Sequence, residues 1–174
     1  MNKKNKLSKT YAIGVAACTF FVCIDQWTKY LAVTFLRGNN GISLWEGIFR
    51  FYYLENRGAA FGIFQDQKVY FIVSAVFILL LFGYCYFKMP LTKHYLPLRV
   101  CCVLLSAGAI GNLIDRIKLN YVVDFLYFEL IDFPIFNVAD MYVVTATLLL
   151  AFLILFYYKE EEFTFLFSKR NSKE

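Results

Sequence analysis

The chain has 174 residues, of which 60% are hydrophobic, with a net charge of +5 and a mean hydropathy of +0.54. A water-soluble domain of this length has too little interior to bury so much apolar surface, so the composition predicts a membrane protein. No repeat, low-complexity tract or Pro/Ser-rich linker divides the sequence, and we expect a single integral membrane domain over residues 1–174.

Four apolar stretches are long enough to cross a bilayer: about 11–36, 69–88, 97–115 and 138–158. Of the 18 basic residues, 11 lie near the two termini or the short link after the second span, and six lie in loops 37–68 and 116–137. The positive-inside rule then places both termini in the cytoplasm and the two long loops outside. The basic charge indicates topology and gives no sign of nucleic-acid binding.

The first span begins with a pattern that resembles a lipid-acceptor site, Val15-Ala16-Ala17-Cys18 after several lysines. The apolar run continues through Ile24, so we expect a retained helix and not a cleaved signal segment. The five cysteines all lie in apolar spans without a C-x-x-C spacing, and we expect small buried hydrophobic residues. The only histidine, His94, lies in the cytoplasmic link, which argues against a zinc site or a Ser-His-Asp triad.

Span one also carries Asp25 and Lys29, whose i,i+4 spacing predicts an ion pair on one helical face. Asp25 would lie about 21 Å from the cytoplasmic end of the helix. The alternative is that the pair only fixes helix packing, because charges inside a membrane usually find partners.

The outer end of span three places Asn112, Asp115 and Arg116 on one face, after small residues that permit close helix approach. Asn112 would lie about 20 Å from the inner end of its span, a depth similar to that of Asp25. Spans one, three and four all become polar at this depth. Structural ion pairs do not require such agreement, so the pattern favours a functional site.

The first outer loop contains an aromatic-rich segment, Arg50–Glu55, that predicts a strand. The run Asn56–Gly62 follows, and its small residues, Gly58 among them, would let the backbone approach a ligand or a helix closely. The loop is either an interfacial anchor or a platform that positions a substrate.

Asp124 lies in the β-like run Val122–Phe125, and Asp140 lies where a polar loop enters the fourth span. Carboxylates at the edge of a membrane are costly, which makes both candidates for function. If the two meet, they share one proton, so that one can activate a water while the other polarises a carbonyl. Asn112 and Asn137 are placed to orient them by hydrogen bonding.

Five blocks in this order resemble the lipoprotein signal peptidases (signal peptidase II), aspartic peptidases of bacterial membranes. They are Asp25–Lys29, Asn56–Phe61, Gly108–Arg116, Val122–Phe125 and Phe136–Asp140. The resemblance implies an all-α membrane protein, with four transmembrane helices and a small extracytoplasmic β-platform built from the outer loops. It implies a catalytic dyad of Asp124 and Asp140, with the site lined or supported by Asp25, Lys29, Asn56, Gly58, Asn112, Asp115, Arg116 and Asn137.

The resemblance further implies removal of signal peptides from prolipoproteins by cleavage before a diacylglyceryl-modified cysteine, without a cofactor, metal or covalent intermediate. The expected partners are lipidated prolipoproteins and membrane lipids. The expected location is the bacterial cytoplasmic (inner) membrane, with the site near the outer leaflet, and a monomer suffices.

The sequence departs from the family pattern at Ala107, Asn120 and Met141. A change to asparagine is mild where a left-handed backbone is needed. We expect Met141 to narrow or reshape the wall beside the dyad, which affects inhibitor fit and leaves the chemistry in place.

Two other functions fit some of these features. A small four-helix transporter subunit would use Asp25, Lys29 and Asp115 as an ion path, although the inner halves of the spans offer little beyond hydroxyl groups. A membrane assembly factor would use the same charges only for helix association.

Overall fold

The computed structural model describes residues 3–58 and 67–167. Within these ranges the chain forms four long helices: α1 (Lys3–Leu36), α2 (Lys68–Lys88), α3 (Leu96–Leu119) and α4 (Val138–Phe152), the last continued by a π-helical segment, η4 (Leu153–Tyr157). All four lie in segments long and apolar enough to cross a membrane. The expected number and order of spans are therefore confirmed.

Two helix boundaries differ from those expected. Helix α1 begins at Lys3 and not near residue 11. Helix α3 runs to Leu119, so residues 116–119, assigned to the second outer loop, are helical. The helix ends at Asn120, which adopts a left-handed conformation (φ 69°) that asparagine tolerates. The extra turn matters for the site because it keeps Arg116 on a rigid element.

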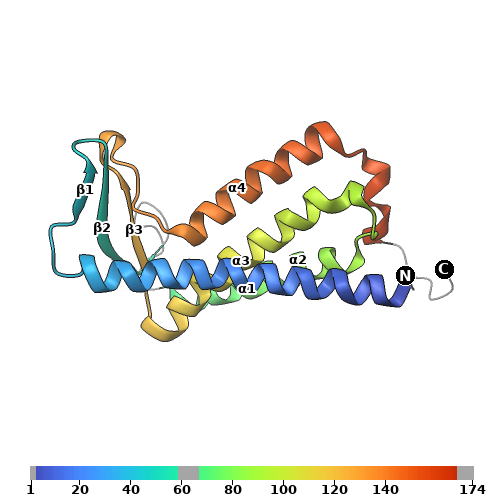
Figure 1. The fold of residues 1–174 in the computed structure, drawn as a ribbon, viewed down its shortest axis with the longest axis horizontal. Helices are drawn as coiled ribbons and strands as arrows, with labels where there is room; N and C mark the ends of the chain where they lie inside the picture. Colours follow the sequence, from blue (N-terminus) through green and yellow to red (C-terminus); the bar gives the residue numbers. More distant parts are fainter. Residues whose placement is uncertain (1–2, 59–66, 168–174) are drawn as a thin grey trace.

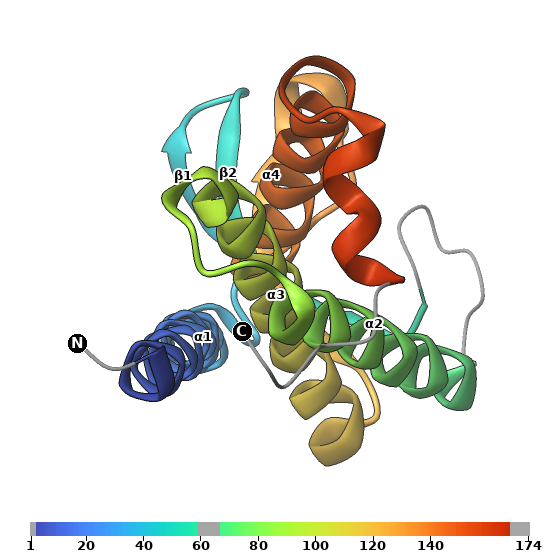
Figure 2. The same ribbon diagram turned by 90° about the vertical axis from the view of Figure 1, so that its right-hand side faces the viewer.

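Helix α3 packs against each of the other three helices, and Figure 2 shows it between α1, α2 and α4. Its small residues allow this. A Cβ atom at Gly108 would lie 2.6 Å from both the carbonyl oxygen of Ala139 and Cγ2 of Val143, so only glycine lets α4 approach so closely. Ala107 is fully buried in the same stretch. The small-residue run therefore fixes where α4 begins relative to α3.

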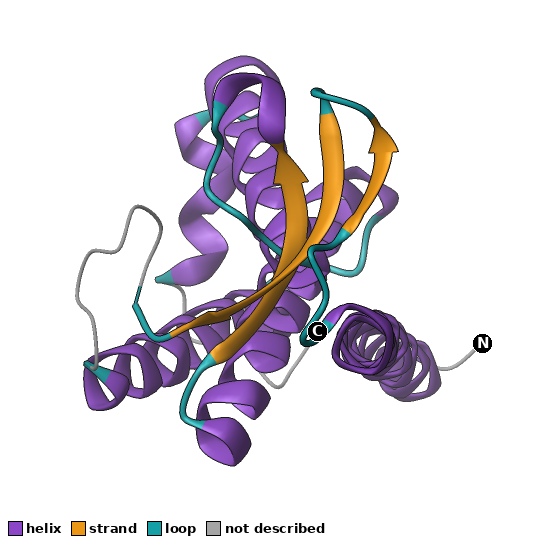
Figure 3. Ribbon diagram, turned by 90° about the vertical axis from the view of Figure 1, so that its left-hand side faces the viewer, coloured by secondary structure: helices purple, strands orange, loops and turns teal. Residues whose placement is uncertain are grey.

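Three strands form an antiparallel sheet in the order β1 (Ile42–Trp45), β2 (Phe49–Asn56) and β3 (Val122–Phe128). The sheet lies across one end of the helices, opposite the end where α1 starts (Figures 1 and 3). Strands β2 and β3 match the predicted segments, and β1 is an additional strand that sequence reasoning missed. The sheet is built from the two long loops, as expected for the β-platform.

A short bridge joins the sheet to α4. The backbone N–H groups of Phe125 and Leu126 donate to the carbonyl oxygen of Phe136, and the N–H of Phe136 donates back to Leu126. This bridge brings the residues before α4 alongside β3. It is the reason that two elements separated by a loop place their polar residues together.

The opposite end is closed by the C-terminal segment. A 3₁₀ segment, η5 (Glu160–Leu166), packs on the link between α2 and α3, where Tyr95 donates to the carbonyl oxygen of Glu162 and His94 contacts the Glu162 carboxylate. His94 thus lies on η2 (Lys93–Tyr95), in contact with the C-terminal segment.

The cysteines are free, and Cys101 and Cys102 are buried as expected. The expectation is wrong for Cys23, which is exposed, and Cys18 and Cys85 are only partly buried. The reason is that α1 and α2 turn much of their surface outward, toward what would be lipid in a membrane.

Gly108→Ala tests the close approach of α3 and α4. We expect the added methyl group to clash with the α4 backbone and to lower the free energy of unfolding by about 1–3 kcal/mol. The matched control is Gly83→Ala in α2, where a Cβ atom would meet nothing within 4 Å. Thermal unfolding of both variants in the same detergent measures the difference, and equal melting temperatures would contradict the packing argument.

Candidate functional site

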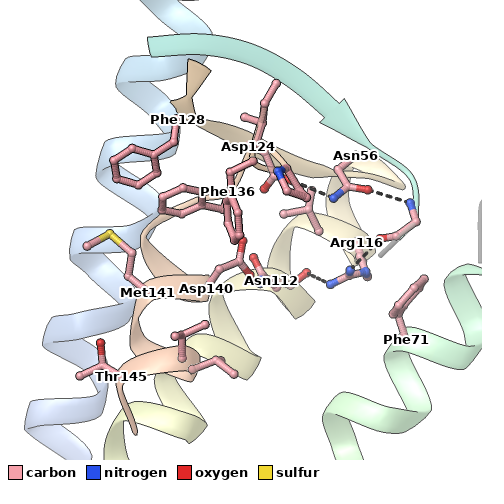
Figure 4. Close-up of a pocket in the computed structure, with 17 residues that line it drawn as sticks. Asn56, Phe71, Asn112, Arg116, Asp124, Phe128, Phe136, Asp140, Met141 and Thr145 are labelled. Carbon is pink, nitrogen blue, oxygen red and sulfur yellow. Dashed lines mark hydrogen bonds between the residues drawn. The ribbon is translucent and has the colours of Figure 1, made fainter. Parts of the chain in front are cut away.

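A cavity of about 610 Å³ opens between the sheet and the ends of α2, α3 and α4 that face it. Its polar part consists of residues that the sequence singled out: Asn56, Gly58, Asn112, Arg116, Asp124 and Asp140. The rest is mainly apolar, with Phe128, Phe136 and Met141 on one side and Phe71 beside Arg116 on the other (Figure 4). A carboxylate pair therefore borders a space suited to a largely apolar ligand.

Asp124 lies on β3 and is almost completely buried. Its two oxygens accept hydrogen bonds from two side-chain amides, Oδ2 from Asn56 at 2.8 Å and Oδ1 from Asn137 at 2.6 Å. Burial, followed by the charge of neighbouring Asp140, raises the pKa of Asp124 to about 7, although the two amides oppose this. The group is therefore set to change its protonation near neutral pH.

Asp140 lies in the first turn of α4, where it completes a capping box with Asn137. The backbone N–H of Asn137 donates to Asp140 Oδ2 at 3.1 Å, and the backbone N–H of Asp140 donates to Asn137 Oδ1 at 3.0 Å. The other carboxylate oxygen, Oδ1, accepts from the Asn112 amide at 2.8 Å. Asn137 thus bridges the two carboxylates, through its side chain to Asp124 and its backbone to Asp140.

The orientation of each asparagine amide is determined by a group that can only donate. The oxygen of Asn56 accepts from the N–H of Gly58, that of Asn137 from the N–H of Asp140, and that of Asn112 from the Lys29 ammonium. Each amide must therefore turn its NH₂ group toward a carboxylate. Both aspartates are surrounded by hydrogen-bond donors as a consequence.

Behind this layer lies a buried ionic cluster that joins α1 to α3. The ammonium of Lys29 lies 3.0 Å from Asp25 and 2.9 Å from Asp115, and it donates to Asn112 at 2.9 Å. The predicted Asp25–Lys29 pair is confirmed, and Asp115 joins it. The amide of Gln26, to which sequence reasoning gave no role, donates to both carboxylates.

The two supporting carboxylates also hold the backbone next to the dyad. Asp25 Oδ1 accepts from the N–H of Ala139 at 2.9 Å, and Asp115 Oδ2 accepts from the N–H of Val123 at 3.2 Å. Ala139 and Val123 immediately precede Asp140 and Asp124, respectively. The ionic cluster therefore fixes the position of both strand β3 and helix α4 at the site.

Arg116 connects the site to the first outer loop. Its guanidinium lies 4.4 Å from the ring centroid of Phe71 and 3.5 Å from the carbonyl oxygen of Gly58, to which it donates. Gly58 is buried, and its backbone contacts both Arg116 and Asn56. The remainder of the predicted small-residue block, Ala59, Ala60 and Phe61, lies outside the described residues.

All ten predicted site residues thus lie in one region, but in two layers. Six line the cavity, whereas Asp25, Lys29, Asp115 and Asn137 lie behind it. Gln26 and Phe71 were missed; Gln26 lies inside the Asp25–Lys29 block, and this was the only signal that could have identified it. Among the described residues, no group of three or more His, Cys, Asp or Glu side chains is arranged to hold a metal ion.

A sequence profile of signal peptidase (SPase) II matches residues 17–156. The chain belongs to the signal peptidase II family. It is 39% identical over 145 residues to a lipoprotein signal peptidase of Caldanaerobacter subterraneus, covering 83% of this chain and 97% of that relative. It is 44% identical over 144 residues to a lipoprotein signal peptidase of Clostridium tetani, covering 80% and 88%.

Solved structures of similar fold are also membrane enzymes. Two structures described as bacterial membrane enzymes are 30% identical to the chain, with TM-scores of 0.73 and 0.72. They cover 83% and 84% of this chain, which in turn covers 88% and 95% of theirs. With its four apolar helices, this signal peptidase II family member is a multi-pass membrane peptidase.

The raised pKa of Asp124 predicts a pH-dependent stability difference. From about pH 4 to about pH 7 the unfolded chain loses this proton while the folded protein keeps it, since an unfolded carboxyl has a pKa of about 3.9. Wild-type stability should fall by about 1.4 kcal/mol per pH unit relative to Asp124→Asn, with a constant difference above about pH 7. Thermal unfolding across this range measures the difference. A gap that does not widen with pH would contradict the burial argument.

Proposed function

We propose that the protein is an intramembrane aspartic endopeptidase that removes signal peptides from prolipoproteins by cleaving before a diacylglyceryl-modified cysteine. The observation that carries this proposal is the pair Asp124 and Asp140, bridged by Asn137 at the edge of a largely apolar cavity. The names of the curated relatives, lipoprotein signal peptidases, support the substrate class.

In the proposed reaction the two aspartates share one proton and one negative charge. The ionised carboxylate takes a proton from water, whose oxygen forms a bond to the carbonyl carbon of the scissile peptide. The protonated carboxyl donates to the carbonyl oxygen as charge develops there. The C–N bond then breaks, the leaving nitrogen takes up a proton, and no covalent intermediate with the enzyme forms.

The donors around the dyad support this chemistry. Asn56, Asn112 and Asn137 hold the carboxylates by N–H groups, so neither side chain is free to turn away from the cavity. The guanidinium of Arg116 also lines the cavity, and it supplies a positive charge near a site that carries a net negative charge during the reaction. Gly58 brings its backbone to the same edge.

The apolar wall supports a lipidated substrate. One side of the cavity is lined by Phe128 at the end of β3, Phe136 before α4, and Met141 and Val144 on α4. Acyl chains gain about 0.8 kcal/mol for each CH₂ group that is buried, so an apolar channel beside the dyad would hold the modified cysteine next to the scissile bond.

The charge distribution and the fold support a location in the cytoplasmic membrane of a bacterium. The sheet lies at the end opposite the start of α1 (Figure 1), so cytoplasmic termini would place the dyad near the outer leaflet. We further propose that the chain acts as a monomer, since one chain supplies every group used above.

The transporter alternative is less well supported. Asp25, Lys29 and Asp115 bind one another and the backbone before each dyad aspartate. These contacts are typical of residues that support a site, whereas an ion path requires charged groups that are exposed to a water-filled passage.

The dyad is tested with Asp124→Asn and Asp140→Asn in the purified full chain. We expect each change to abolish cleavage of a diacylglyceryl-modified prolipoprotein, because neither amide can replace both the acid and the base, while substrate binding is retained. Asp132→Asn is the matched control, since Asp132 is exposed, has a left-handed backbone that asparagine tolerates, and does not line the cavity. Wild-type turnover by either dyad variant would refute the assignment.

The substrate class is tested by comparing the same prolipoprotein with and without the diacylglyceryl group. Because the apolar wall contributes binding energy only when acyl chains are present, we expect kcat/KM to fall at least about a hundredfold without them. Initial rates measured with both substrates in the same detergent decide the point. Equal rates would contradict the proposed specificity while leaving peptidase activity intact.

A further inference from the structure

The two aspartates receive different kinds of hydrogen bonds. Asp124 lies on a strand, and both of its donors are side-chain amides. Asp140 lies in the first turn of α4 and accepts from a backbone N–H as well as from the Asn112 amide. The N-terminal end of a helix favours negative charge, and the backbone donor cannot rotate away. The surroundings of Asp140 are therefore better suited to a carboxylate.

Lys29 reinforces this difference without touching either aspartate. Its ammonium donates to the oxygen of Asn112, and the opposite end of the same amide donates to Asp140. A charged donor strengthens the hydrogen bond on the far side of an amide that it polarises. It also prevents Asn112 from turning its oxygen toward Asp140, which would favour a protonated carboxyl there.

The charged groups near the dyad come from α1 (Asp25 and Lys29), α3 (Asp115 and Arg116) and the dyad itself. Arg116, the other cation, interacts with both aspartates and so does not favour one of them. The four supporting charges sum to zero, so a dyad with one negative charge leaves the region with a net charge of −1. The Asn112 oxygen accepts from Lys29 and from the Asn137 amide, but the NH₂ group of Asn112 donates to Asp140 rather than to Asp124, so the amide that the cation polarises acts on Asp140.

We propose that Lys29 is a positioning residue that assigns the two roles within the dyad. Acting through Asn112, it makes Asp140 the carboxylate that takes the proton from water and leaves Asp124 as the carboxyl that holds the shared proton. This inference rests on the proposed function, because it names which member of the same dyad performs each step.

Carboxyl NMR of the full chain, labelled with [4-¹³C]aspartate, tests the assignment without turnover. The signals of Asp124 and Asp140 are identified by their loss in the corresponding asparagine variants. We expect the wild-type Asp124 signal to titrate at a higher pH than the Asp140 signal, because Asp140 accepts from a backbone N–H and from the polarised Asn112 amide. The reverse pattern would overturn the assignment, whether or not the protein cleaves prolipoproteins.

The role of Lys29 is tested by two variants that differ only at this residue. Asp25→Asn leaves the Lys29–Asn112 contact in place, and the asparagine oxygen can still accept from the Ala139 N–H. The double variant Asp25→Asn, Lys29→Met removes one negative and one positive charge together. We expect Asp140 to take up a proton in the neutral range only in the double variant. The acidic limb of kcat/KM should move to higher pH, with about a tenfold loss of rate below it for each pH unit.

Lys118→Met removes an exposed cation from the end of α3 and should leave both readouts unchanged. If the double variant does not fold, Lys29→Gln replaces it, because the glutamine amide can still donate to Asn112 but carries no charge. If Asp140 titrates in the variant that lacks the Lys29 ammonium as it does in the wild-type protein, Lys29 has only a structural role. Loss of cleavage with an unchanged titration would lead to the same conclusion.

Discussion

The need to satisfy one buried ammonium group determines most of the site. Lys29 is 3% exposed in a segment suited to a membrane, where an unpaired charge costs several kcal/mol. Its three acceptors, Asp25, Asp115 and Asn112, lie within 3.0 Å and come from two helices. Helices α1 and α3 must therefore meet at this depth. Asp25 and Asp115 also accept hydrogen bonds from the backbone beside the dyad, at Ala139 and Val123.

Asparagine serves the inner layer better than a charged residue would. An amide accepts through its oxygen and donates through its NH₂ group. A fixed donor that holds the oxygen therefore turns the NH₂ group toward the carboxylate on the other side. Asn56, Asn112 and Asn137 all act in this manner, with fixed donors from a loop, a lysine and a helix cap. An aspartate at any of these positions would place a third carboxyl group beside the dyad and, when ionised, would present only acceptors.

The sequence predicted the parts of the structure that depend on local spacing. The i,i+4 rule gave the Asp25–Lys29 pair, and aromatic and β-branched composition gave β2 and β3. Contacts between elements that are distant in the sequence could not be predicted from local spacing. The bridge from Phe136 to β3 and the joining of Asp115 to the cluster depend on how α3 and α4 pack, which no local pattern specifies.

The same burial that makes the dyad costly also makes it useful. A carboxyl whose pKa lies near 7, as for Asp124, can hold a proton at neutral pH and still release it, whereas a solvated aspartate cannot. Apolar side chains such as Phe136 and Met141, which border the carboxylates, limit their hydration. The wall that would receive acyl chains is thus also the wall that raises the pKa. On the proposed function, acyl chains that fill the cavity would exclude more water from the dyad, so that substrate binding would also affect the protonation of the two aspartates.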